Sequence, residues 1–144
     1  MYKKILLAYD GSESGQKALL DCHDIAQWSQ AELFLVAVRP LLLNQIGMEG
    51  TFYDAELEEN EANKYKAILA DGLSRLTERG HKATGEVLLG ESVDQISKAA
   101  KRLKVDLIVV GHRHLDSWAA RWWRGSVSAS LVEHSPCSVL VAML

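Results

Sequence analysis

The stretch KILLAYDGS, residues 4–12, decides the fold of this chain. Its apolar run from Ile5 to Tyr9 does not alternate with polar residues, a pattern typical of a strand that is covered on both faces in a parallel sheet. Asp10 and Gly11 end the strand, and Ser12 can cap the helix that follows. A strand that passes directly into a helix predicts the opening unit of an α/β protein.

The same alternation of strand and helix continues to the end of the chain. The second to fifth strands are predicted from apolar runs at 32–38, 82–89, 106–110 and 138–142. Helical spacing predicts helices between them, and Ser92 with Gln95 predicts a capping box for the third helix. The order βαβαβαβαβ predicts a single α/β domain over residues 1–144, built on a doubly wound, Rossmann-like parallel sheet of five strands.

The expected strand order locates a binding crevice. We place the first strand at the centre, with the second and third on one side and the fourth and fifth on the other, so that the third and last strands form the edges. Ligands of such sheets bind at the carboxyl ends of the strands, where the strand order reverses. Asp10 and Gly111 are therefore expected to face each other across this crevice.

Composition excludes several classes of protein. The 16 basic against 19 acidic side chains give a formal charge of −3, so a general affinity for nucleic acid is not expected. Cys22 and Cys137 lie far apart without a C-x-x-C motif, and both are interpreted as reduced, buried thiols rather than metal ligands. The apolar run at 5–9 is too short for a signal peptide or a membrane span. We therefore expect a cytoplasmic protein that binds neither nucleic acid nor membrane.

Phosphate binding is indicated at two places, although the common phosphate motifs are absent. Neither G-x-G-x-x-G after the first strand nor G-x-x-x-x-G-K-[ST] occurs, so hydride transfer and Walker-type phosphoryl transfer lose support. Gly111 ends a strand and Gly125-Ser126 starts a helix, and each can bring backbone amides close to an anion. Positive charge nearby comes from Arg113, Arg121 and Arg124.

Four segments span nearly the whole chain: KILLAYDGS at 4–12, GES at 90–92 leading to Ile96, DLIVVG at 106–111, and GSVS at 125–128 continuing through SPCSVLV at 135–141. In this order they resemble the universal stress protein family. The resemblance implies an adenine nucleotide alpha hydrolase-like fold and a cytoplasmic homodimer that binds ATP or AMP, with or without Mg²⁺. It also implies a regulatory protein that acts through partners and is not an enzyme.

The resemblance further implies which residues form the nucleotide site. Asp10 would lie by the ribose or a metal, the backbone around Val38 by the base, and Gly111 by the phosphates. The family's nucleotide-binding branch continues from Gly111 with two residues, a glycine, nine residues and Gly-Ser or Gly-Thr; this chain has His114 at the second glycine and a loop that is one residue longer. The expected cofactor-binding residues are Ala8, Tyr9, Asp10, Val38, Gly111, His112, Arg113, His114, Arg124, Gly125, Ser126 and Val127.

The departure at His114 keeps two further hypotheses open. A side chain with a Cβ stands where bare backbone normally approaches the phosphates, so the alternative is a dimeric interaction protein of the same family that binds no nucleotide. A weak nucleotide hydrolase is the third hypothesis. His112 and His114 opposite Asp10 resemble metal ligands or an acid–base pair, but a third ligand at a telling spacing is missing. No catalytic or metal-binding residue is therefore predicted.

Two surfaces are predicted to bind protein partners. Trp118, Trp122 and Trp123 lie close together with arginines, a composition favoured at interfaces. They form a partner-binding patch, a wall against the adenine or a lid over the end of the sheet. The last strand leaves an edge with unpaired backbone groups. Since this strand pairs with its symmetry mate in the resembling family, we expect a homodimer through residues 138–142.

Overall fold

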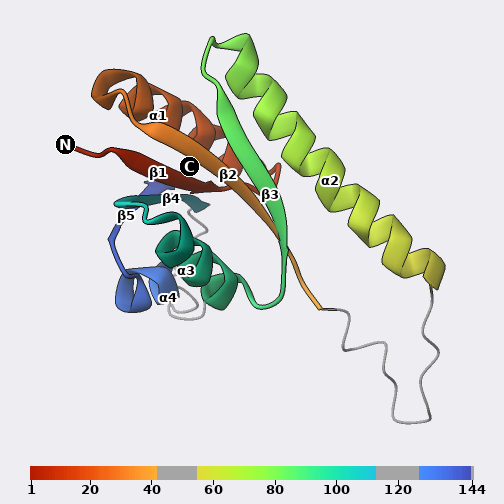
Figure 1. Cartoon of the computed structure of the whole chain (residues 1–144). Helices are drawn as coiled ribbons and strands as arrows, with labels where there is room; N and C mark the ends of the chain where they lie inside the picture. Colours follow the sequence, from red (N-terminus) through yellow and green to blue (C-terminus); the bar gives the residue numbers. More distant parts are fainter. Residues whose placement is uncertain (42–54, 113–126, 144) are drawn as a thin grey trace.

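The computed structural model describes residues 1–41, 55–112 and 127–143, and the strands in these parts form one parallel sheet in the order β3-β2-β1-β4-β5 (Figure 1). β1 is central and β3 and β5 are the edges, so the predicted strand order is confirmed. The strands are β1 (Lys4–Ala8), β2 (Glu32–Arg39), β3 (Ala83–Leu89), β4 (Leu107–His112) and β5 (Ser138–Met143), and the helices are α1 (Glu13–Ser29), α2 (Ala55–Glu78), α3 (Ser92–Leu103) and α4 (Val127–His134).

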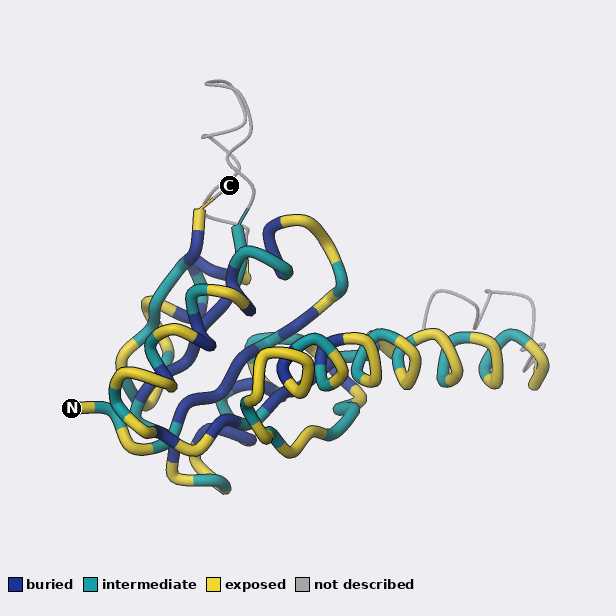
Figure 2. Tube along the Cα trace, turned by 90° about the horizontal axis from the view of Figure 1, so that it is seen from above, coloured by how far each residue is buried: buried dark blue, intermediate teal, exposed yellow. Residues whose placement is uncertain are grey.

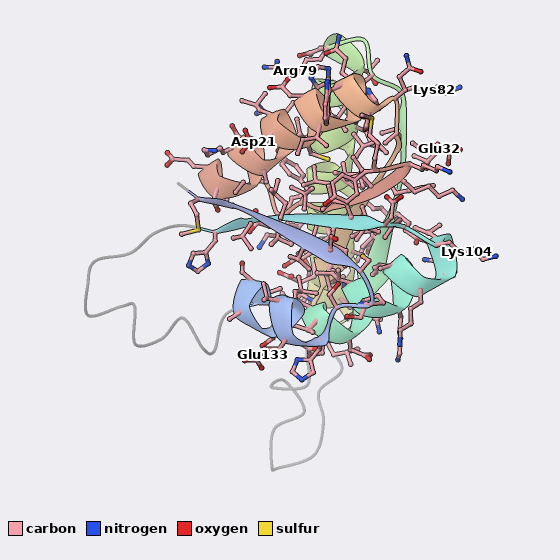
Figure 3. All side chains as sticks on the ribbon, turned by 90° about the vertical axis from the view of Figure 1, so that its left-hand side faces the viewer. Asp21, Glu32, Arg79, Lys82, Lys104 and Glu133 are labelled. Carbon is pink, nitrogen blue, oxygen red and sulfur yellow. The ribbon has the colours of Figure 1, made fainter. Side chains whose placement is uncertain are left out.

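The helices form one layer on each face of the sheet. Figures 1 and 3 show α1 and α2 on one face and α3 and α4 on the other. Side chains alternate along a strand, so β1 contributes to both cores: Ile5 and Leu7 pack on the α1 and α2 side, and Leu6 packs on the α3 and α4 side. All three are fully buried, as is most of the sheet centre in Figure 2. This burial explains the unbroken apolar run at the start of the chain.

The amino end of α3 differs from the prediction. Instead of a capping box made by Ser92 and Gln95, the structure has Glu91 as the N-cap, and its carboxylate accepts hydrogen bonds from the amides of Val93 (3.0 Å) and Asp94 (2.8 Å). Gly90 has a φ of +144°, which turns the chain so that Glu91 is extended in front of the helix. A carboxylate here satisfies two free amides and is favoured by the helix dipole, which a serine hydroxyl is not.

β4 ends later than predicted. Gly111 and His112 are strand residues paired with β5, whereas the sequence places His112 in a loop. The strand also begins one residue later, at Leu107, and just before it the Asp106 carboxylate accepts hydrogen bonds from the backbone amides of Lys3 (2.9 Å) and Lys4 (3.1 Å). Asp106 thereby fastens the amino end of β1 to the start of β4.

The long helix α2 is covered only in part. The predicted buried face of Ala62, Tyr65, Leu69, Leu73 and Leu76 is only half-buried, except for Leu76, which is fully buried beside the buried Gly72. Figures 1 and 2 show why: the amino-terminal half of α2 extends beyond the end of the sheet. Its apolar stripe therefore continues past the layer against which it packs.

Two expectations drawn from composition can be compared with the structure. Cys22 is fully buried on α1, and this burial raises the pKa of its thiol, as expected for a structural cysteine; Cys137, just before β5, is half-buried. Within the three described ranges, none of the helices has the combination of length and apolar character that crossing a membrane requires.

Two histidines meet where α1 packs against the turn between α2 and β3. The rings of His23 and His81 lie edge to face with their centroids 5.8 Å apart. His23 is buried, with Nδ1 3.2 Å from the Asp24 carboxylate and Nε2 3.4 Å from the backbone oxygen of Arg79. Burial, and secondarily the neighbouring His23, lower the pKa of His81 below its ordinary value of 6.5. His81 therefore takes up a proton less readily in the folded protein than in the unfolded chain.

We expect the free energy of unfolding to fall as the pH drops below about 6.5. In that range the unfolded chain takes up a proton at His81 that the folded chain refuses, and this difference continues down to the lowered folded pKa. His81→Gln removes the titrating group and should flatten the loss. Urea unfolding between pH 5 and 8 measures both slopes, and equal slopes would contradict this account.

Candidate functional site

A pocket of about 140 Å³ lies at the carboxyl ends of β1, β2 and β4, on the face that carries α3 and α4. It is the crevice that the sequence predicts, since β1 separates β2 from β4 at the point where the strand order reverses. Six of the predicted site residues, from four separate segments of the chain, line it together: Ala8, Tyr9, Asp10, Val38, Gly111 and Val127.

The remaining predicted site residues have different outcomes. His112 is the last residue of β4 and is not among the residues that line the pocket, so its role stays a prediction. The other five, Arg113, His114, Arg124, Gly125 and Ser126, lie outside the described residues, as do Trp118, Trp122 and Trp123.

Sequence reasoning missed four lining residues, Ser92, Ile96, Val110 and Ser128. Ser92 and Ile96 are one helical turn apart on α3, and Ile96 belongs to the apolar stripe that the sequence already assigns to the inner face of this helix. That stripe was a usable signal, because the inner face of α3 has to meet the carboxyl ends of the strands. Val110 precedes Gly111 and could have been found in the same way.

Asp10 is held in one orientation by the start of α1. Its Oδ1 accepts hydrogen bonds from the backbone amide of Ser12 (3.0 Å) and from the Ser12 hydroxyl (2.5 Å). The Ser12 hydroxyl in turn accepts from the amide of Gly15 (3.1 Å), which makes Ser12 the predicted N-cap. Gly11 has a φ of +80°, so a glycine suits the tight turn between them. The carboxylate is thus pre-oriented at the mouth of the pocket.

Gly111 has a reason for being glycine that the sequence did not indicate. A Cβ at this position would lie 2.2 Å from the backbone oxygen of Ser14 and 2.8 Å from the amide nitrogen of Gly15. The missing side chain therefore makes room for the first turn of α1. Sequence analysis assigns this glycine to close approach by a phosphate, whereas in the structure its Cβ side is filled by protein backbone.

The helix ends around the pocket differ in charge. The first amides of α3 are already satisfied by the Glu91 carboxylate. α4 begins at Val127 and Ser128, which both line the pocket, and its first turn carries no acidic residue. The partial positive charge at the amino end of a helix favours a nearby anion, and no acidic side chain in the first turn of α4 opposes it.

The side chains around the pocket are mainly aliphatic or carry hydroxyl groups. Across residues 1–41, 55–112 and 127–143, no three His, Cys, Asp or Glu side chains are grouped so that they could hold a metal ion. Among the described residues that line the pocket, Asp10 is the one with a carboxylate. Apolar walls with a few polar groups are typical of small-molecule sites in general.

Comparison with known proteins places this arrangement in a family. The model of the universal stress protein family matches residues 1–142. This chain belongs to that family. Universal stress protein YxiE of Bacillus subtilis is 34% identical to it, over 98% of this chain and 99% of the relative.

Solved universal stress proteins share the fold. One from Arabidopsis thaliana, with AMP bound, has a TM-score of 0.71 at 21% identity and covers 98% of this chain and 91% of its own. A universal stress protein in complex with cAMP also has a TM-score of 0.71, at 24% identity, over 97% of this chain and 96% of its own. The resemblance stated from sequence is thereby confirmed at the level of family and fold.

In this universal stress protein, Gly111→Ala should lower the free energy of unfolding by about 3 kcal/mol, the upper part of the usual range for overpacking, because the clash is with backbone that cannot rotate away. Gly80→Ala is the control: its Cβ would meet nothing within 4 Å, and the left-handed φ of +77° alone should cost about 1 kcal/mol. Denaturant unfolding compares the two, and an equal loss in both would show that the approach of α1 does not require Gly111.

Proposed function

We propose that this protein binds an adenine nucleotide, ATP or AMP with or without Mg²⁺, in the pocket at the carboxyl ends of β1, β2 and β4. The observation that carries the proposal is the convergence of Asp10, Val38, Gly111 and the start of α4 on one crevice. An aliphatic wall, a carboxylate held in one orientation and the amino end of a helix match the three parts of a nucleotide, which are base, ribose and phosphate.

Each part of the ligand has a suitable partner in the lining. Val38, Ile96 and Val110 supply an apolar surface for a purine ring. The Asp10 carboxylate can accept hydrogen bonds from ribose hydroxyls. At about 140 Å³ the pocket is smaller than a typical ligand site of roughly 300–1,000 Å³, so it accounts for part of the ligand. The residues predicted for the phosphates, such as Arg113 and Gly125, belong to the part of the chain that the structure leaves undescribed.

Two relatives support this choice of ligand. The Arabidopsis thaliana protein of this family was solved with AMP bound, and another universal stress protein was solved with cAMP. Both ligands carry adenine, ribose and one phosphate, the three groups for which this pocket has matching surfaces. We infer a regulatory role in the cytoplasm, through protein partners and without turnover.

Nucleotide binding can be tested at the start of α4. Val127→Glu places a carboxylate beside the first amides of the helix, where it should repel phosphate and weaken binding about tenfold, since a charge at a helix end contributes up to about 2 kcal/mol. Val132→Glu makes the same change on the same helix at a residue that does not line the pocket, and should bind like wild type. Isothermal titration calorimetry with AMP and ATP measures all three proteins.

The outcomes separate the hypotheses. If the wild-type protein takes up neither nucleotide at millimolar concentration, the proposal fails, and the alternative of a dimeric interaction protein that binds no nucleotide stands. If Val127→Glu binds as tightly as Val132→Glu, the phosphate lies elsewhere. Steady release of phosphate from ATP would favour the third hypothesis, a weak hydrolase.

A homodimer through β5 is part of the proposal. β5 is an edge strand of the sheet. Its residue Val141 is half-buried and packs against the core on the face that carries α3 and α4. An edge strand offers unpaired backbone groups to a second copy related by a twofold axis.

Val141→Lys should therefore reduce the particle mass from dimer to monomer in light scattering, because it places a charge on the strand that pairs. Val132→Lys, on the neighbouring helix α4 and more exposed, is the control that should stay dimeric. Circular dichroism checks that both variants are folded. A dimer mass that survives in the folded Val141→Lys variant argues against this interface.

A further inference from the structure

The long helix α2 contacts the backs of the strand ends that form the pocket. The pocket opens on the α3 and α4 side of the sheet, and α2 lies on the opposite side (Figure 1). Residues at the ends of β1 and β2 nevertheless contact both the pocket and α2, because the side chains of neighbouring residues in a strand point to opposite faces of the sheet. At Tyr9 and at Arg39, side chains from these ends contact α2 through polar groups.

Tyr9 joins the end of β1 to α2. It lines the pocket, while its side chain packs in the core formed with α1 and α2. Its hydroxyl donates a 2.6 Å hydrogen bond to Oδ2 of Asp71, which also accepts from Nε of Arg75. The ring lies against Gly72, where a Cβ would be 2.8 Å from Cδ1 of Tyr9.

This hydrogen bond persists over the physiological pH range. Burial and the Asp71 carboxylate raise the pKa of Tyr9 to about 12, so the hydroxyl stays a donor. The same bond is the main cause that lowers the pKa of Asp71, which therefore stays an acceptor. Tyr9 itself is only 2% exposed, and a buried hydroxyl that lost its acceptor would be costly.

Arg39 joins the end of β2 to the same helix. It follows Val38, which lines the pocket, and its guanidinium forms an ion pair with Glu58 of α2. The Arg39 side chain is 12% exposed, so this charge depends on its partner. Its backbone oxygen accepts a 2.9 Å hydrogen bond from the amide of Gly90, which leads into α3. Arg39 thereby connects α2 with the turn before Ser92, another lining residue.

We propose that Tyr9 and Arg39 are positioning residues through which nucleotide binding and the docking of α2 stabilise each other. The inference rests on the proposed function, since it concerns the regulation of the same pocket. A ligand that orders the strand ends restrains Tyr9 and Arg39, which contact α2. In turn, a firmly docked α2 holds the pocket backbone in its binding geometry. Such coupling is reciprocal: the factor by which the nucleotide stabilises the docking of α2 equals the factor by which docked α2 raises the affinity for the nucleotide.

The experiment compares two matched aspartates. Asp71 and Asp21 each form an ion pair with a residue four positions away on its own helix, and they are similarly exposed, at 46% and 39%. Only Asp71 also accepts from Tyr9. Each is replaced by alanine, and the more tightly binding of AMP and ATP is used as the ligand.

Two quantities are measured: the dissociation constant by calorimetry, and hydrogen–deuterium exchange of α2 with and without nucleotide. In the wild-type protein and in the control variant Asp21→Ala, the nucleotide should slow hydrogen–deuterium exchange in α2. In Asp71→Ala the dissociation constant should rise about fivefold, the lower end of common coupling strengths, and the slowing in α2 should be lost. Tyr9→Phe added to Asp71→Ala should weaken binding no further, because both changes remove one hydrogen bond.

A parallel pair tests the second contact. Glu58→Ala leaves Arg39 without its partner on α2, whereas Glu59→Ala removes the neighbouring, exposed carboxylate. We expect weaker binding and faster exchange of ligand-bound α2 only in Glu58→Ala.

The proposal is overturned if Asp71→Ala binds nucleotide as tightly as Asp21→Ala, or if the nucleotide still slows exchange in α2 of that variant. A merely structural hydrogen bond would lower the melting temperature and leave the ligand-dependent slowing intact. Failure of the wild-type protein to bind either nucleotide overturns the proposed function itself and is recognised before any variant is made.

Discussion

The approach of β4 to the first turn of α1 is the contact on which the site depends. Gly111 allows it, because the space of a side chain there is taken by the backbone of Ser14 and Gly15. The same first turn is tied to Asp10 through Ser12, so the distance from β4 to α1 also fixes the carboxylate relative to Val110 and Gly111. One missing Cβ thus sets the geometry of two walls of the pocket.

A second glycine, Gly72, allows a close contact between α2 and the sheet, on the face that α1 also covers. Gly72 lets α2 lie directly on the Tyr9 ring and on Leu35, whose Cδ2 would be 2.6 Å from an added Cβ. The pocket is therefore supported from behind by both helices of the opposite layer, α1 beneath Gly111 and α2 beneath Tyr9. A displacement of either helix should therefore reach the pocket residues, since protein interiors are packed too densely to absorb it locally.

Sequence reasoning recovers the fold because its signals are local and strong. The unbroken run at 5–9 predicts a strand buried on both faces, and the doubly wound order that places this strand at the centre is the order observed. The crevice follows from that order, and Asp10 and Gly111 could be assigned to it before any coordinates. Signals that depend on exact backbone geometry were out of reach: the cap at Glu91 depends on the φ of Gly90.

The rest of the site could not be predicted for a related reason. Ser128 lines the pocket because of how α4 docks, and Tyr9 reaches Asp71 across 62 positions of chain. Neither leaves a pattern in neighbouring residues. The resemblance to universal stress proteins added Val38 and Val127 to the site, but a family motif carries no information on which contacts tie the pocket to the helix behind it.

The central place of β1 also constrains how the chain can fold as it is synthesised. β1, β2 and β3 can pair early, since they follow one another along the chain, but the other edge of β1 waits for β4, where Ile5 aligns with Leu107. Until then a fully apolar strand has an open side, and partly folded chains of this kind are prone to aggregate. The hydrogen bonds from the amides of Lys3 and Lys4 to Asp106, just before β4, likewise wait for this part of the chain. Production of the protein in soluble form should therefore depend on the speed of translation through its last third.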